Sequence, residues 1–139
     1  MSSQYESVQL AELYPEVFNV AAPAVPVGRQ VWPRKPGVFI RKVQATADAP
    51  AQPDDAEAAP TPLVLELVAG QFGLVPPWVK SASDAKLRST KLVNARSEVV
   101  TTSNNFRNAW LNGQRCIVPM MAFIEEDFRS GKAVPTRIA

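Results

Sequence analysis

Histidine is absent from this 139-residue sequence, and Cys116 is its single cysteine. One cysteine cannot form a disulfide within the chain. Without histidine, the usual zinc sites and histidine general bases cannot be built. We therefore expect no metal and no cofactor, and we expect Cys116 to fill space in the core rather than to act as a nucleophile.

Long apolar runs and a strong charge of one sign are also lacking. No segment approaches the ~18 consecutive apolar residues that a membrane span needs. The chain does not open with a charged segment followed by an apolar one, as a secretion signal would. These absences favour a cytoplasmic protein. Because the net charge is only +2, binding of nucleic acid would have to come from local basic clusters.

The chain does have enough apolar residues for a core. With 46% apolar residues, one domain over residues 1–139 is expected, and a monomer is favoured. Residues 44–62 are dominated by alanine, proline and aspartate, a composition that cannot repay the entropy of ordering, so a disordered insert is predicted there. The β-rich runs at 38–43 and 63–68 are predicted to pair as a hairpin.

Further elements are predicted from local patterns. Ser3 and Glu6 match a capping box, so a helix is expected to follow and to end at Pro15. Residues 101–103 offer N-caps for a helix of about ten residues, with Gly113 as its stop. Strands are expected at 18–21, 72–75, 116–118, 123–127 and 133–138, the third of them buried and the last preceded by a turn at 130–131.

Three polar side chains could carry chemistry. Asn94 donates and accepts hydrogen bonds, Arg96 presents a planar fork of donors, and Glu125 can move a proton if its surroundings raise its pKa. Strand alternation should place Glu125 beside Phe123, and burial there should raise the Glu125 pKa. Structural alternatives stay open. Asn94 could cap a strand, Arg96 could pair with Glu98, and the carboxylate could be a solvated strand end.

Trp78 and the segment after it offer a possible surface for nucleic acid. Trp78 follows two prolines, and it either caps the core or provides a platform for an unpaired base, worth ~1–3 kcal/mol per base. Residues 80–91 are the most basic window of the chain, with the acid Asp84 and the bases Lys80, Lys86, Arg88 and Lys91. This window is either a solvated loop or a surface that neutralises phosphates, which would make binding salt-dependent.

Several short segments, taken in order, resemble one known family. They are Phe18-Asn19-Val20-Ala21, Phe72-Gly73-Leu74-Val75-Pro76-Pro77-Trp78, Asn94-Ala95-Arg96-Ser97-Glu98, Phe106-Arg107-Asn108-Ala109-Trp110, Arg115-Cys116-Ile117-Val118-Pro119 and Phe123-Ile124-Glu125. In this order and spacing, over most of residues 18–139, they resemble the SRAP family. These are the SOS response-associated peptidase domains that attach covalently to abasic sites in single-stranded DNA.

The resemblance implies an α+β fold with a mixed, partly barrel-like β-sheet and short helices. It implies a DNA–protein crosslink at abasic sites and a peptidase activity that removes the initiator methionine, both in the DNA damage response. Asn94 would hold the sugar of the abasic site, Glu125 would move the proton, and Arg96 would grip the backbone phosphate. The DNA-binding residues implied in this way are Arg96, Trp78, Asn19, Phe106, Arg107 and Lys91.

Two departures from the family pattern qualify this implied activity. Ser2 stands where the family has its nucleophilic cysteine, which is exposed once Met1 is removed, and the family's later histidine is missing. The chain also ends where roughly the second half of such a domain would begin, so we interpret it as a divergent or incomplete member, such as a phage-type relative. Two other classes stay open: a non-enzymatic single-strand-binding module, and an assembly protein whose open sheet edge pairs with a partner chain.

Overall fold

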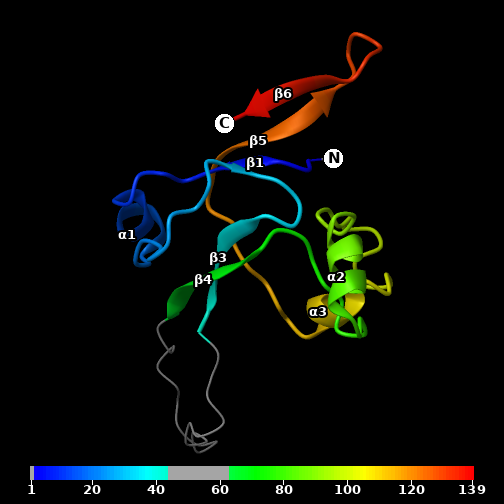
Figure 1. Cartoon of the computed structure of the whole chain (residues 1–139), viewed down its shortest axis with the longest axis horizontal. Coiled ribbons are helices and arrows are strands. Elements are labelled where there is room, and N and C mark those ends of the chain that lie inside the picture. Colours follow the sequence, from blue (N-terminus) through cyan, green and yellow to red (C-terminus); the bar gives the residue numbers. More distant parts are fainter. Residues whose placement is uncertain (1, 44–62) are drawn as a thin grey trace, which may run out of the picture.

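The computed structural model describes residues 2–43 and 63–139, which form short strands and short helices (Figure 1). In chain order the elements are β1 (Tyr5–Ser7), α1 (Leu13–Phe18), β2 (Gln30–Val31), β3 (Pro36–Lys42), β4 (Leu65–Gln71), α2 (Ala82–Ser89), α3 (Arg107–Leu111), β5 (Met120–Asp127) and β6 (Val134–Ile138). The predicted α+β class is therefore confirmed. The predicted disordered insert at 44–62 lies outside the described residues. None of the helices in the described ranges has the length and apolarity that crossing a membrane requires.

The strands form two antiparallel sheets. One has the order β2-β1-β5-β6, and the other is the hairpin β3-β4. The hairpin strands pair along their whole length, as predicted for 38–43 and 63–68. An isolated bridge between Ile40 and Ile117 links the hairpin to the segment before β5. Within residues 2–43 and 63–139 every pairing is antiparallel and the sheets do not close, so the mixed, partly barrel-like sheet expected from the resemblance is not what these residues form.

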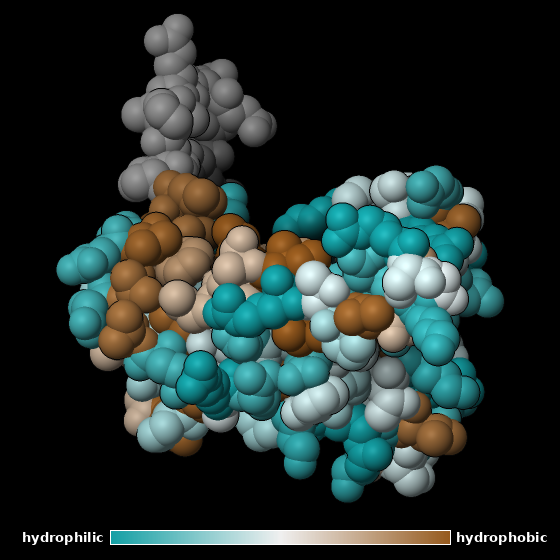
Figure 2. Space-filling view, turned by 90° about the horizontal axis from the view of Figure 1, so that it is seen from above, coloured by the Kyte–Doolittle hydropathy of each residue, from teal (hydrophilic) through white to brown (hydrophobic). Residues whose placement is uncertain are grey.

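The main apolar core lies where α1 and its flanking segments pack on the β3-β4 hairpin. Its buried residues are Val8, Tyr14, Val20, Val38 and Ile40, with Leu65 and Leu67 of β4 packed against them. The Tyr14 hydroxyl donates a hydrogen bond to the Val8 carbonyl oxygen at 2.9 Å, so the one polar atom of this side chain is satisfied inside the core. On the outside, Figure 2 shows apolar residues gathered at one end of the visible face, with mainly hydrophilic residues and scattered apolar ones over the rest.

The amino-terminal region differs from its prediction. Strand β1 stands where a helix was expected, because Tyr5 pairs with Val31 of β2 on one side and with Phe123 of β5 on the other. All residues of β1 are buried. Pairing on both sides satisfies the backbone of β1, so the local capping signal at Ser3 and Glu6 is overridden by tertiary contacts.

Helix α1 also lies in a place the local pattern did not predict. Pro15 falls in its first turn rather than beyond its end, and the missing N–H of a proline costs nothing there, because first-turn N–H groups have no partner within the helix. Asn19 closes the helix in the left-handed conformation, with φ 55. The strand predicted for 18–21 is therefore a helix end.

Other predictions are settled segment by segment. The strand predicted at 123–127 lies within β5, and the strand predicted at 133–138 covers β6. A turn around residues 130–131 separates them. Residues 72–75 bend away from the sheet, because Gly73 takes a φ of +116. The helix ending before Gly113 is only five residues long. Cys116 is exposed rather than buried, because its segment forms an isolated bridge with β3 at Ile117 rather than a continuous strand of the sheet.

Candidate functional site

Three polar residues from distant parts of the chain meet beside the amino terminus. The Ser2 hydroxyl donates a hydrogen bond to Oε2 of Glu125 at 2.8 Å, across 123 residues of sequence. The Asn94 side-chain amide donates to the Ser2 carbonyl oxygen at 2.7 Å, across 92 residues. All three residues are partly buried. We call Ser2, Asn94 and Glu125 the amino-terminal cluster.

Strand pairing creates this cluster. Strand β1 runs antiparallel to β5, with Tyr5 opposite Phe123 and a backbone hydrogen bond of 3.0 Å from Ile124 to the Gln4 carbonyl. In this antiparallel pair, the residues before Tyr5 lie beside the residues after Phe123. Ser2 therefore lies beside Glu125. The segment before β1 has no strand of its own, so its position depends on these few contacts.

Glu125 is ionised in this environment. Its pKa lies below the ordinary glutamate range because the terminal ammonium of the chain and the Ser2 hydroxyl stabilise the carboxylate. The predicted rise of its pKa through burial beside Phe123 is therefore wrong, because hydrogen bonding outweighs desolvation. Because it is ionised, the Glu125 carboxylate can accept a proton. The neighbouring Glu126 is exposed to solvent.

Asn94 and Arg96 lie in a segment without helix or strand between α2 and α3. Asn94 does not cap a strand; its amide holds the amino-terminal backbone instead. Arg96 is exposed. The ion pairs found among the described residues do not include one between Arg96 and Glu98, so the guanidinium is available to an external anion.

Trp78 borders a second feature, an open hollow of about 390 Å³ lined by Trp78, Asn104, Arg107 and Asn108. Its indole N–H donates to the Asn104 carbonyl oxygen at 3.2 Å. Trp78 is 44% exposed, so it does not cap the core. The Arg88 guanidinium lies 4.7 Å from the ring centroid, a favourable cation–π distance.

Most of the basic window at 80–91 forms helix α2 rather than a loop, and only its ends lie outside the helix. Ser81 caps α2 by accepting a hydrogen bond of 3.1 Å from the Asp84 backbone. Asp84 also holds Arg88 at 2.9 Å, which fixes the guanidinium against Trp78. A Ser followed three residues later by an acid is a helix-start signal that the sequence reading missed. Lys86 and Lys91 are exposed.

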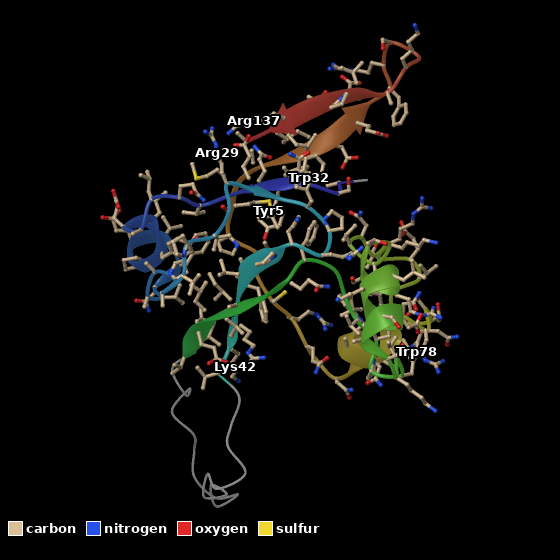
Figure 3. All side chains as sticks on the ribbon, in the orientation of Figure 1. Tyr5, Arg29, Trp32, Lys42, Trp78 and Arg137 are labelled. Atoms are coloured by element: carbon tan, nitrogen blue, oxygen red, sulfur yellow. The ribbon has the colours of Figure 1, made fainter. Side chains whose placement is uncertain are left out.

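The structure brings together only some of the residues implied in DNA binding. Trp78 and Arg107 line the same hollow, and Phe106 directly precedes α3. Asn104 and Asn108 also line it, although the sequence reading did not select them. Asn19 closes α1, which lies on the opposite side of the molecule from α2 and α3 (Figure 1). Figure 3 places Trp78 on the α2 and α3 side.

Comparisons with solved structures agree with this architecture. A crystal structure of a protein from Bordetella bronchiseptica superposes with a TM-score of 0.72 and 34% sequence identity, over 97% of this chain and 56% of that one. The chain therefore spans little more than half the length of this similar structure. At this identity and coverage, the two proteins are alike in sequence as well as in fold.

Curated relatives match over shorter stretches. The abasic site processing protein YoaM of Bacillus subtilis is 39% identical over 69 residues, which are 49% of this chain and 28% of the relative. The abasic site processing protein HMCES of Gallus gallus is 32% identical over 65 residues, 47% of this chain and 19% of the relative. The family described as SOS response associated peptidase matches residues 4–139. This chain belongs to the SRAP family.

Proposed function

We propose that this chain binds single-stranded DNA at abasic sites and captures the ring-opened sugar with its amino terminus. The observation that carries the proposal is the amino-terminal cluster, in which Ser2 contacts both Asn94 and Glu125. The names of the relatives support the choice of substrate. A peptidase step is part of the proposal, because hydrolysis of the bond between Met1 and Ser2 must first free the Ser2 amine.

The proposed capture step uses that amine. A free α-amine has a pKa of about 7.7–8.0, so a sizeable fraction is neutral at physiological pH. The nitrogen would add to the aldehyde carbon, and the ionised Glu125 would take the released proton and return it to the departing hydroxyl as water. The product is an imine plus one water. Asn94, by holding the Ser2 carbonyl oxygen, would position the amine, in addition to any contact with the sugar.

Serine in place of cysteine changes the fate of this adduct. A hydroxyl closes a ring onto the imine carbon far less favourably than a thiolate does, because it is a weaker nucleophile near neutral pH. The imine therefore either hydrolyses back or loses the 3′ phosphate by β-elimination, which cleaves the strand. We expect a transient complex rather than a permanent crosslink.

The Trp78 hollow would hold the neighbouring nucleotides. One unpaired base would stack on the exposed indole, worth ~1–3 kcal/mol. Arg96 would contact a backbone phosphate, with Arg107, Phe106 and Lys91 along the same strand. Binding would fall with increasing salt, because each neutralised phosphate releases counterions.

A second candidate function is a DNA-binding module without chemistry. It is favoured by the replacement of the family's cysteine by Ser2 and by the absence of histidine from the sequence. In this reading the cluster only fastens the amino terminus, and the Trp78 hollow binds intact and abasic strands equally.

Intact mass measurement separates the two functions. The protein is incubated with a single strand containing one abasic site, with and without borohydride, and Ser2→Cys is treated in parallel. Capture predicts a trapped adduct only with borohydride for the natural chain, and a heat-stable adduct for Ser2→Cys without it. Glu126→Gln serves as the matched control and should leave trapping unchanged. If neither protein formed an adduct but both still shifted the DNA in a gel, the chain would be a binding module without capture chemistry.

A further inference from the structure

A second hollow of about 390 Å³ has chemistry that the proposed function does not use. Its lining includes Glu6, Leu10, Arg29, Met121 and Arg137, and Figure 3 shows Arg29 and Arg137 near each other.

The strand register places this hollow away from the amino-terminal cluster. Arg137 is opposite Ile124, and Glu6 is opposite Ala122. Directly paired residues share a sheet face and alternate residues change face. The Glu6 and Arg137 side chains therefore lie on the face away from Glu125. Met121 also lines this hollow, because the β-bulge between Glu6 and Ser7 interrupts the alternation of β5 at that point.

The charges of this hollow do not cancel. Arg137 grips Glu6 through two hydrogen bonds, from Nε at 3.0 Å and from Nη2 at 2.8 Å. A guanidinium has five N–H donors, so this fork leaves the others of Arg137 for a ligand. The Arg137 hydrogen bonds also lower the pKa of Glu6, which is therefore ionised. Among the residues that the structure describes, the Arg29 guanidinium makes no hydrogen bond or ion pair, although its charge also helps to lower the pKa of Glu6. Two guanidiniums and one carboxylate give a net charge of about +1.

A single positive charge suits a ligand with a single negative charge. A phosphodiester carries one negative charge, whereas a phosphomonoester carries about 1.5 to 2 at neutral pH. Guanidinium forks match the oxygens of phosphate. Leu10 and Met121 are 54% and 46% exposed at this hollow, so an apolar surface lies beside the charges. This apolar surface fits a sugar or a base.

We propose that this hollow binds a phosphodiester group of a nucleic-acid strand, with Arg29 and Arg137 on the phosphate oxygens. The adjoining sugar lies against Leu10 and Met121. This site adds a second contact with a strand on the sheet face opposite the amino-terminal cluster. It needs neither the Ser2 amine nor an abasic site, so it stands or falls separately from aldehyde capture.

A dinucleotide with one phosphodiester tests this site directly. The full chain is labelled with ¹³C at its methionine methyl groups, and the Met121 signal is assigned by its loss in Met121→Leu. Thymidylyl-thymidine should shift this signal saturably. Its neutral methylphosphonate analogue should bind at least ~10-fold more weakly, because charge-assisted hydrogen bonds are lost. Inorganic phosphate alone should shift the signal less than the dinucleotide at equal concentration.

Two variants locate the binding charge. Arg29→Gln should weaken dinucleotide binding at least ~10-fold, and Arg29→Lys should weaken it less. Arg129→Gln is the matched control, because Arg129 pairs with Asp127 beside the turn after β5; it should not change binding. An unmoved Met121 signal, equal binding of the neutral analogue, an equal shift with inorganic phosphate, or unchanged binding by Arg29→Gln would each overturn the proposal. The neutral-analogue comparison needs no variant, so it decides the matter even if Arg29→Gln folds poorly.

Discussion

Gly73 connects the β3-β4 hairpin to the Trp78 hollow, and replacing it by alanine should destabilise the fold strongly. A Cβ added at Gly73 would lie 2.2 Å from the Ser89 carbonyl oxygen and 3.0 Å from its carbon, at a φ of +116. These are backbone atoms at the end of α2, so no side chain can swing away to relieve the overlap. Ser89 is fully buried, and its hydroxyl accepts a hydrogen bond from Gln71 at 3.1 Å, which holds the end of α2 in place.

The size of the effect follows from two costs. The unusual backbone conformation costs about 1–3 kcal/mol for a residue with a Cβ, and forcing extra volume into a packed contact costs about 1–3 kcal/mol. Gly73→Ala should therefore lose about 2–6 kcal/mol of unfolding free energy. Gly113→Ala is the matched control, since Gly113 has a φ of +70 but nothing within 4 Å of an added Cβ. It should lose only about 1–2 kcal/mol.

Urea unfolding followed by circular dichroism measures both losses, provided that each variant unfolds in one transition. Gly73→Ala should also weaken binding of single-stranded DNA under conditions where it is folded, because residues 72–78 carry Trp78 to its hollow. If Gly73→Ala lost no more stability than Gly113→Ala, the close approach of the loop to α2 would be wrong.

Further predictions concern the proposed site. Arg96→Ala should weaken binding of an abasic single strand by ~1.5–3 kcal/mol in fluorescence anisotropy, and an unchanged affinity would remove Arg96 from the interface. Trp78→Ala should lose ~1–3 kcal/mol of the same binding energy, with Trp78→Phe losing less; equal losses would argue against stacking. Glu125→Gln should abolish borohydride trapping, and trapping that depended on Glu126 instead would refute the assigned face of β5. Because the terminal ammonium and the Ser2 hydroxyl lower the Glu125 pKa, the tether to Ser2 should hold above the ordinary glutamate range and be lost as pH falls through the lowered pKa. Carboxyl ¹³C titration checks this, and Ser2→Ala should raise the pKa; no rise would contradict the contact.

Local patterns predicted the elements whose partners are close in sequence or strongly patterned. The β3-β4 hairpin follows from two β-rich runs, and β5 and β6 follow from alternating residues around a turn at Gly131. The sequence also predicted the family, because several motifs in the right order and spacing are specific together even though each motif alone is weak. Helix α2 was predictable as well, since Ser81 and Asp84 form the start signal that it uses.

Contacts between distant residues decided the rest. The capping signal at Ser3 and Glu6 was real but weak, worth about 1 kcal/mol, and it lost to strand pairing on both sides of β1. The same pairing carries Ser2 to Glu125, and it reversed the predicted direction of the Glu125 pKa shift. By itself the sequence determined the fold class, the β3-β4 hairpin, the family, and Asn94 and Glu125 as candidates. Only the tertiary structure decided that these two residues meet at Ser2, because hydrogen bonds across 92 and 123 residues leave no trace in any local pattern.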